Sequence, residues 1–231
     1  MRVSGKMKVD VITLFPEIIR SVLEYGILNR AIDRQLLRVN LHQLRDFTND
    51  RHQTVDDYPY GGGAGMVLKP EPIFAAVHAL NPGSETRVIF LTPQGKRLTQ
   101  CCVEALSLES HLILICGRYK GIDERVRTKL VTDEISIGDY VLSGGEVAAQ
   151  VLIDAIGRVL PNAMNDYRSA QEDSFSQDLL DHPHYTRPVE FEDIRVPDVL
   201  LSGHHQNIEQ WRYDQSVART IQRRPDLIRQ P

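Results

Sequence analysis

Three glycine-containing segments, each directly after an apolar run, restrict most strongly the folds that this chain can adopt. They read LTPQG (91–95), CGRYKGIDER (116–125) and SIGDYVLSGGE (136–146). The apolar runs have the length of buried strands and are separated by helical patterns, so the sequence predicts an α/β protein with a mainly parallel sheet. Because the carboxyl ends of parallel strands meet at one edge, where α/β proteins bind ligands, we expect the three segments to form one binding site.

The periodicity of apolar residues predicts an ordered succession of elements up to Pro161. Beyond it the alternation of strands and helices stops, so we expect a domain over 1–162, a flexible linker over 163–173 and a small all-helical domain over 174–231. The predicted strands are 8–15, 36–44, 86–93, 111–117 and 132–138. The predicted helices are 16–35 with a break near Gly26, 69–80, 98–108, 123–131, 146–160, 174–180 and 207–224.

Composition and charge indicate a soluble globular protein of the cytoplasm. Of the 231 residues, 42% are hydrophobic and 25% charged. No apolar run approaches the roughly 18 residues expected of a membrane span, and the N-terminus lacks the apolar core of a secretory signal. Met7 is an alternative start to Met1. Cys101, Cys102 and Cys116 lack metal-binding or disulfide spacing, so we expect reduced thiols. The net charge of −4 disfavours general coating of nucleic acid but leaves room for a small RNA footprint.

The common nucleotide-binding motifs are missing from the sequence. GGGAGM (61–66) does not fit G-x-G-x-x-G, and no G-x-x-x-x-G-K-[ST] segment is present. The three segments combine glycines with few chargeable side chains, which favours a ligand held largely by backbone N–H and C=O groups. An adenine ring suits such contacts. The alternative is that the glycines only shape tight turns.

Further motifs follow one another in a fixed order along nearly the whole chain. Besides the three segments above they are LFPE (14–17), DFTNDRH (46–52), TVDDYPYGGGAGM (54–66), EDSF (172–175), HYTRP (184–188), VPDVLLSG (196–203), WRYDQS (211–216) and RRPDL (223–227). In these motifs the chain resembles the bacterial tRNA (guanine-N1)-methyltransferase family, which belongs to the knotted SPOUT class. The resemblance implies transfer of a methyl group from S-adenosylmethionine to N1 of guanosine 37 in tRNA, next to the anticodon.

The resemblance also implies a deep trefoil knot at the end of the first domain. Strands 86–91, 111–117 and 131–139 with their loops form this knot, and S-adenosylmethionine binds inside it in a bent shape. A homodimer with sites built from both subunits is implied too. The family's reaction is linked to magnesium, although the sequence shows no dedicated metal cage. The residues implied in cofactor binding are Pro93, Gly117, Ile137, Gly138, Asp139, Tyr140, Val141, Leu142, Gly144 and Gly145.

The resemblance implies two catalytic residues, Arg158 near the end of the first domain and Asp173 at the end of the linker. Guanine N1 carries a proton, so its methylation needs a base and a group that stabilises the developing charge. By resemblance, Asp173 is the general base, and Arg158 stabilises the charge or orients the guanine. From the sequence alone, Asp173 is also a typical helix N-cap and Arg158 a typical cation at a helix end. Asp173 can do both.

The polar stretch 46–66 is long for a compact domain and is therefore a candidate recognition loop. We expect His52 and Asp56 to contact the target guanosine and its neighbour, with Asp56 accepting guanine N–H groups. The alternative is a polar surface loop that uses Asp at its turns. The arginine-rich segment 204–231 suits tRNA phosphates. Four histidines are expected to be structural: His182, His184, His204 and His205.

Two positions depart from the family pattern. Lys120 stands where many relatives have Glu, so the contact of that Glu with the methionine end of the cofactor is not carried over. Tyr58 stands where a basic residue is common. The alternative function is a non-catalytic RNA-binding or ribosome-assembly protein with a knotted fold. An enzyme that uses a nicotinamide cofactor would need the dinucleotide fingerprint that this chain lacks.

Overall fold

The computed structural model describes residues 6–163, 173–175 and 178–228. Contacts divide the chain into two units, Met1–Asn165 and Asp166–Pro231. The predicted linker 163–173 lies outside the described residues except for its ends, Ala163 and Asp173, and so stays a prediction. Every helix within the described residues is too short or too polar to cross a membrane.

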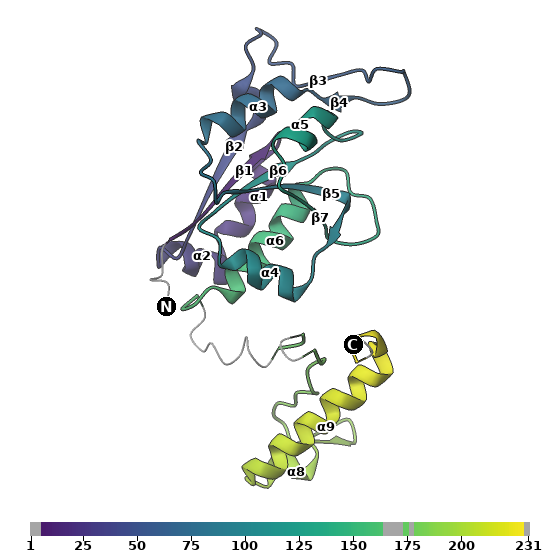
Figure 1. Cartoon of the computed structure of the whole chain (residues 1–231). Coiled ribbons are helices and arrows are strands. Elements are labelled where there is room, and N and C mark those ends of the chain that lie inside the picture. The colour runs from purple at the N-terminus through teal and green to yellow at the C-terminus, as the bar shows by residue number, and fades with distance from the viewer. Residues whose placement is uncertain (1–5, 164–172, 176–177, 229–231) are drawn as a thin grey trace. The chain divides into compact units, whose positions relative to one another are not determined.

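The first unit is built on a five-stranded sheet in the order β2-β1-β6-β5-β7 (Figure 1). Each pair of neighbouring strands is parallel, which confirms the predicted α/β class with a mainly parallel sheet. β5 continues beyond its predicted end to Arg97. The strands are β1 (Met7–Thr13), β2 (Leu37–Gln43), β5 (Arg87–Arg97), β6 (His111–Cys116) and β7 (Asp133–Ser136).

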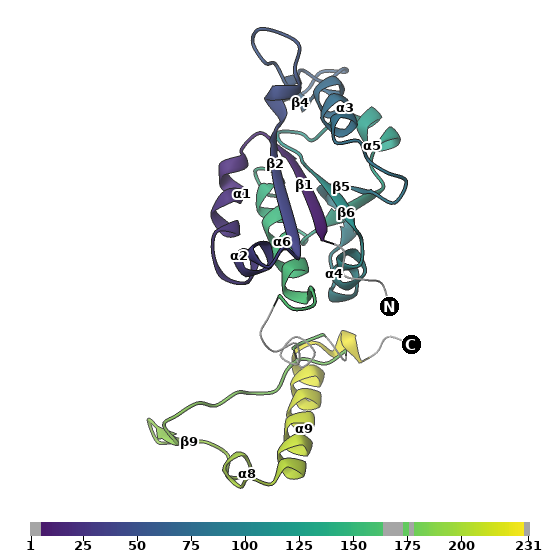
Figure 2. The same cartoon turned by 90° about the vertical axis from the view of Figure 1, so that its left-hand side faces the viewer.

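Helices between the strands cover both faces of this sheet. The expected break in the first helix is confirmed, because Gly26 has a φ of 67°, a left-handed conformation that glycine adopts without steric cost. Figure 2 shows α1 and α2 on one side of the sheet and α3 and α5 on the other. The helices are α1 (Pro16–Leu23), α2 (Gly26–Asp33), α3 (Pro70–Ala79), α4 (Gln100–Ser107), α5 (Glu124–Lys129) and α6 (Glu146–Val159).

The alternation of side chains along β6 gives each face of the sheet its own core. Leu112 and Leu114 pack with buried residues of α1, α2, α4 and α6. Ile113 and Ile115 pack with buried residues of α3 and α5. All four side chains are almost completely shielded from solvent, as expected of a strand at the centre of a sheet that is covered on both faces.

The polar stretch between β2 and α3 contains regular structure that its sequence did not predict. A short 3-10 helix, Leu44–Phe47, follows β2, and β3 (Asp56–Asp57) pairs antiparallel with β4 (Val67–Leu68). The apolar residues beside the two strands anchor this hairpin, since Val55 and Leu68 are fully buried. The residues between β3 and β4 form an exposed loop that ends in the glycine-rich GGGAGM.

The second unit contains one long helix and several short elements. The predicted helix 207–224 is confirmed as α9 (His205–Arg223). The predicted helix 174–180 is wrong for its described residues, which form turns and bends, because Phe175 and Asp178 adopt left-handed φ values of 76° and 58°. The expectation of an all-helical domain also missed a hairpin. The short elements are β8 (Glu190–Phe191), β9 (Ile194–Arg195), α8 (Asp198–Leu201) and a 3-10 helix at Pro225–Leu227.

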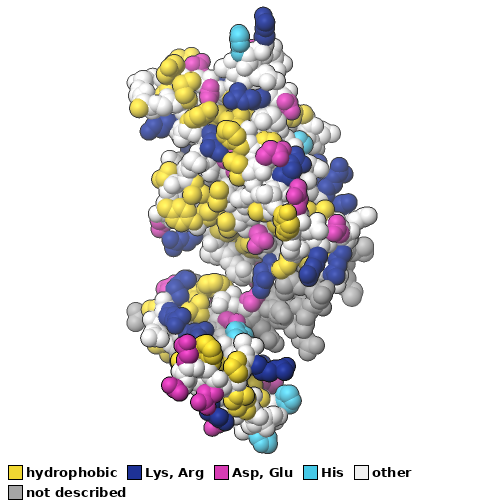
Figure 3. All heavy atoms as spheres, turned by 180° about the vertical axis from the view of Figure 1, so that it is seen from behind, with side chains coloured by type: hydrophobic (Ala, Val, Ile, Leu, Met, Phe, Trp, Pro, Cys, Tyr) yellow, Lys and Arg dark blue, Asp and Glu magenta, His cyan; other side chains and the backbone are white. Residues whose placement is uncertain are grey.

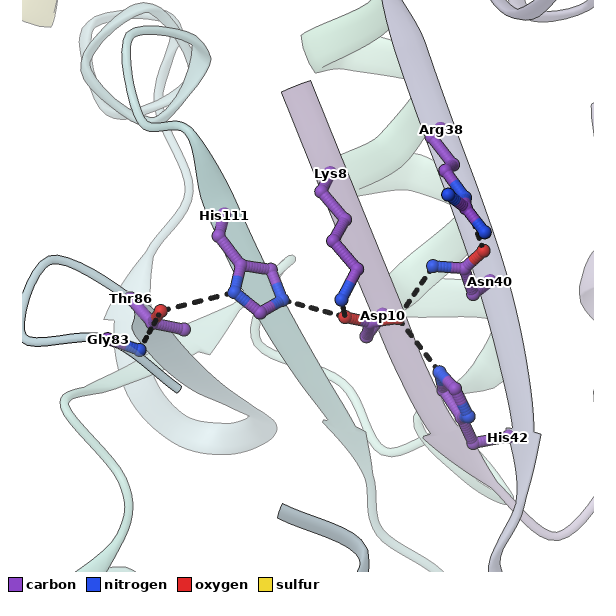
Figure 4. A network of polar contacts seen from close by, with 8 residues as sticks. All are labelled: Lys8, Asp10, Arg38, Asn40, His42, Gly83, Thr86 and His111. Atoms are coloured by element: carbon purple, nitrogen blue, oxygen red, sulfur yellow. Dashed lines mark hydrogen bonds and ion pairs between the residues drawn. The ribbon is translucent and has the colours of Figure 1, made fainter. Parts of the chain in front are cut away.

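Asp10 on β1 is the centre of a buried polar network that links three strands (Figure 4). Its side chain is fully shielded from solvent. Asn40 donates to Oδ1 over 2.8 Å, and His42 Nε2 lies 2.8 Å from the same oxygen. His111 Nε2 and Lys8 Nζ each lie 2.7 Å from Oδ2. The carboxylate therefore ties β1 to β2 and to β6 at the centre of the sheet.

This network sets the direction in which acid changes stability. Burial by itself raises the pKa of Asp10, but the hydrogen bonds from His42, Lys8, Asn40 and His111 outweigh it and hold the pKa well below its usual range. A folded-state pKa below the unfolded-state value means that the ionised form stabilises the fold. The contribution is present above about pH 4 and is lost as the pH falls below that value.

We predict that Asp10→Asn lowers the free energy of unfolding at neutral pH by about 2 kcal/mol, because it removes the charge from several hydrogen bonds. The difference from the parent should shrink between about pH 5 and about pH 3, which urea unfolding followed by circular dichroism would measure. Asp33→Asn is the control, since Asp33 is exposed and accepts a hydrogen bond from Asn29. An equal difference at both ends of this pH range would contradict the assignment.

Candidate functional site

The C-terminal half of β5 and the segments after β6 and β7 enclose a cavity of about 440 Å³ at the carboxyl edge of the sheet. The structure therefore brings together the three glycine-containing segments that the sequence singled out. All the predicted cofactor residues except Asp139 line the cavity. Asp139 instead is exposed, and its Oδ2 accepts a hydrogen bond from Arg97 at 2.9 Å. The lining residues from the prediction are Pro93, Gly117, Ile137, Gly138, Tyr140, Val141, Leu142, Gly144 and Gly145.

Two of these glycines are required because the chain crosses itself at very short range. A Cβ on Gly145 would lie 2.8 Å from Cys116 Cα. The backbone N–H of Gly145 donates a hydrogen bond to the Gly117 carbonyl at 2.9 Å. A Cβ on Gly144 would lie 2.3 Å from Arg118 Nε. No larger residue fits at Gly145 without movement of the backbone of β6. The glycines thus hold the loop after β7 directly against the end of β6.

A buried ion pair lies beneath these glycines. Glu146, the first residue of α6, is 1% exposed. Its Oε2 lies 3.1 Å from Arg118 Nη2, and its Oε1 accepts a hydrogen bond from Thr13 at 2.8 Å. The Arg118 guanidinium also stacks on Phe15, 4.4 Å from the ring centroid. Glu146 therefore joins the ends of β1 and β6 to the start of α6, where the helix dipole also favours a negative charge.

None of the three residues of this cluster, Glu146, Arg118 and Thr13, was predicted from the sequence as a residue of the binding site. Both charged residues stand inside quoted motifs, SIGDYVLSGGE and GRYKGIDER, but their partners are distant in sequence. The sequence did offer one indication of Glu146. It stands directly before the apolar helix 147–160, where its carboxylate would be buried and would therefore need a partner. Thr13 gave no such signal.

The C-terminal half of β5 passes β7 at backbone contact distance. Ile135 on β7 pairs with Leu91 and again with Lys96, so the intervening residues of β5 bulge out of the sheet. A Cβ on Gly95 would lie 2.4 Å from the carbonyl carbon of Glu134 and 2.4 Å from the Ile135 nitrogen. The bulge of β5 therefore packs tightly against β7 at the cavity wall.

The recognition-loop candidates differ in their relation to the cavity. Asp56 on β3 interacts with Tyr119, a residue of the cavity wall, and this interaction raises the pKa of Tyr119. The glycine-rich loop packs there too, since Lys120 N donates to the Met66 carbonyl at 3.0 Å. His52 is exposed in a turn and is not part of the wall. Neither residue lines the cavity, but Asp56, unlike His52, interacts with a residue of its wall.

The two predicted catalytic residues belong to different units. Arg158 lies half-buried in the last turn of α6, which is the helix-end position that the sequence indicated. Asp173 is half-buried at the beginning of the described part of the second unit, and a turn at Ser174 and Phe175 follows it. The helix that Asp173 was expected to cap does not begin at these residues. Their catalytic roles stay predictions.

A parallel α/β sheet with a glycine-lined cavity at its carboxyl edge is the architecture of a ligand-binding α/β protein. Comparison with known proteins then narrows this class. Residues 7–230 match the family model described as tRNA (Guanine-1)-methyltransferase TrmD. The chain belongs to this family.

Three relatives with the name tRNA (guanine-N(1)-)-methyltransferase show how close the similarity is. The chain is 54% identical over 222 residues to the protein of Staphylococcus haemolyticus. It is 56% identical over 224 residues to that of Anoxybacillus flavithermus and 55% identical over 222 residues to that of Brevibacillus brevis. Each comparison covers 96% of this chain and 91% of the relative, so the resemblance inferred from the motifs is confirmed.

We predict that Gly145→Ala lowers the free energy of unfolding by about 1–3 kcal/mol, because the added Cβ would collide with the backbone of Cys116. Guanidinium unfolding followed by circular dichroism measures this change. Gly83→Ala is the matched control, since a Cβ at Gly83 meets no atom within 4 Å. Equal stability of both variants would show that the close crossing at Gly145 is not a constraint.

Proposed function

We propose that this chain transfers a methyl group from S-adenosylmethionine to N1 of guanosine 37 in tRNA. The observation that carries the proposal is the glycine-lined cavity of a chain that belongs to this family over residues 7–230. The proposed tRNA substrate places the reaction in the cytoplasm. The direct test is methyl transfer to unmodified tRNA transcripts, with the modified nucleotide mapped. Methylation of another nucleotide, or none of a competent transcript, would overturn it.

The cavity fits an adenosyl group because its wall consists mostly of backbone and apolar side chains. Gly144 and Gly145 hold the loop after β7 against the end of β6, and Ile137, Gly138 and Leu142 of that loop line the cavity. When bound, the sulfonium cofactor supplies an electrophilic methyl group. The alternative of a non-catalytic RNA-binding protein predicts no heat in a calorimetric titration with S-adenosylmethionine.

The trefoil knot is part of this proposal. Its support is the tight passage of the bulge in β5 against β7, at Gly95 and Ile135, and the contact of the loop after β7 with the end of β6 at Gly145. The three segments cross one another at distances that exclude side chains. In a knot, such crossings hold a cofactor between loops that cannot separate without unthreading.

At the guanine, two groups of this chain carry the proposed chemistry. Asp173 accepts the proton from N1, so that the nitrogen lone pair can form the new N–C bond while the methyl–sulfur bond of the donor breaks and its electron pair stays on sulfur. Arg158 stabilises the negative charge that develops on N1 and O6. Asp56 and His52 contact the target base and its neighbour, and the interaction of Asp56 with Tyr119, a residue of the cavity wall, supports this for Asp56.

The second unit supplies the proposed tRNA surface. Arg212 and Arg223 are exposed on α9. Arg224 stacks on Phe175 and pairs with Asp226 over 2.6 Å, so part of the positive charge is used within the unit. The remaining cations suit phosphate contacts, which add affinity without reading the sequence.

A homodimer explains an exposed apolar face on the first unit. Phe15, Ile18, Val147 and Val151 on and beside α1 and α6 are 38–47% exposed. The two helices are joined by a hydrogen bond from Gln150 to the Ile18 carbonyl at 2.6 Å, so these side chains share one face. Figure 3 looks at the unit from behind and shows hydrophobic side chains gathered on that side. An isologous partner covers such a face, and its Asp173 completes the site in our proposal.

Lys120 gives this chain a cofactor contact of its own. It lines the cavity, where Arg118 pairs with Glu146 and Arg127 pairs with Glu134. No ion pair within the described residues involves Lys120. Its side chain runs along Gly65, at 3.1 Å from the place of a Cβ, so the glycine leaves room for it. We assign its ammonium group to the carboxylate at the methionine end of the cofactor.

Removal of the proposed base separates catalysis from binding. We predict that Asp173→Asn lowers turnover by about 100-fold or more while the affinity for S-adenosylmethionine changes little. Single-turnover methylation and calorimetry measure the two quantities. Asp178→Asn is the control, because Asp178 is exposed and Asn tolerates its left-handed φ. If the turnover of Asp173→Asn stays within a few-fold of the parent, Asp173 is not the general base and its role is structural.

Subunit mixing tests the composite site. Chains with Asp173→Ala and chains with Gly144→Trp should each form inactive homodimers, because the first lacks the base and the second has a blocked cavity. Mixed dimers should regain one working site of two. The measurement is methyl transfer after exchange, with differently tagged subunits to prove that mixed dimers formed. Background activity in proven mixed dimers would refute the composite site.

A further inference from the structure

The described residues of the second unit form almost no apolar core. Among its described residues only Thr220 is buried, and large apolar side chains such as Phe191 and Ile194 are more than 60% exposed. The cysteines lie in the first unit, at positions 101, 102 and 116, so no disulfide can staple the second. A unit of this size without a core requires another source of stability, such as a metal ion or a partner.

Asp181, His182 and His184 place three metal-ligating groups together in this unit. One ligand atom from each lies within 4.8 Å of the others. His184 Nε2 lies 2.7 Å from Asp181 Oδ2, and His182 Nε2 lies 3.8 Å from Asp181 Oδ1. The side chains of His182 and Asp181 are only 13% and 25% exposed. The expectation that both histidines are merely structural did not foresee this cluster.

The geometry of His182 favours an ion over a direct hydrogen bond. Its Nδ1 lies 3.2 Å from the Pro183 carbonyl oxygen, which can only accept, so the ring proton belongs on Nδ1. Nε2 then carries a lone pair and faces a carboxylate oxygen at 3.8 Å, too far for a hydrogen bond. Zinc binds nitrogen and oxygen at about 2.0–2.2 Å, so an ion fits between the two atoms with a bent angle. A carbonyl partner on the second nitrogen is also the usual support of a ligating histidine.

The backbone around the cluster is fixed by bonds to separate parts of the unit. Asp181 N donates to Ser174 Oγ at 3.0 Å, and the Asp181 carbonyl accepts from Arg219 on α9 at 3.3 Å. Leu180 N donates to Thr220 Oγ1 at 2.9 Å. The ligands are therefore held on a scaffold that joins α9 to the residue after Asp173.

We propose that Asp181, His182 and His184 bind one zinc ion, with water as the fourth ligand. Two imidazoles and one carboxylate suit zinc, whereas magnesium prefers oxygen ligands. His184 exchanges its hydrogen bond to Asp181 for the ion. The ion closes the short segment 181–184, whose backbone is bonded to Ser174 and to Arg219 of α9, and because it binds the folded form it adds to the stability of the unit. This goes beyond the proposed methyl transfer and does not depend on it.

The test uses the full chain, first dialysed against a chelator and then titrated with zinc chloride by calorimetry. We expect saturable binding of one ion per chain and a rise in the Tm of the metal-loaded protein. Cobalt(II) chloride in place of zinc should give the visible absorption bands of a four-coordinate site. Magnesium chloride should not displace cobalt.

Variants decide whether the ion binds at this cluster. His182→Ala and His184→Ala should each weaken zinc binding by at least about tenfold and abolish the cobalt bands. Mutation of a residue that only hydrogen-bonds to a metal ligand already lowers metal affinity by about tenfold or more. The matched control is the double variant His204→Ala/His205→Ala, two adjacent exposed histidines in the same unit, which should bind like the parent. Circular dichroism of each variant without metal establishes that it is folded. Zinc binding that is unchanged in His182→Ala and His184→Ala, or lost only in the control, would overturn the proposal.

Discussion

The buried carboxylate of Glu146 is the interaction on which the arrangement of the cavity depends. It joins Thr13 at the end of β1, Arg118 after β6 and the first turn of α6. Loss of one partner of a buried ion pair costs about 3–5 kcal/mol, because the remaining charge stays desolvated. The end of β1, the segment after β6 and the start of α6 are therefore coupled, because a shift of any of them would separate this carboxylate from a partner.

The glycines make that coupling possible by letting the backbone approach where side chains would collide. Gly144 leaves space for the Arg118 and Glu146 side chains, and Gly145 brings the loop onto the backbone of β6. Gly95 likewise lets the bulge of β5 lie directly on the backbone of β7. The resulting wall presents mostly backbone and apolar groups, which suits an uncharged ring system, while the charged groups beneath it are paired with one another. The one cation of the wall that is left over among the described residues is Lys120.

The two units differ in how they are stabilised, and this difference bears on function. The first has an apolar core on each face of its sheet and the Asp10 network within it. The second relies on α9, short hairpin contacts and polar side chains such as Thr220. A unit that is ordered mainly by surface contacts can adjust to a large polyanion. It also gains most from a partner subunit or a bound ion.

The sequence by itself determined the α/β class, the parallel sheet, the break at Gly26, the helix α9 and the family, because these follow from local periodicity, local turn chemistry and ordered motifs. It also predicted that the three glycine segments share one site, since parallel strands end on the same edge. It missed the β8–β9 hairpin and the turn at Phe175, where two-residue strands and left-handed residues leave no periodic signal. Only the tertiary structure decided which charges are buried together. Thr13 and Glu146 are 133 residues apart, and their pairing depends on chain crossings that local sequence does not encode.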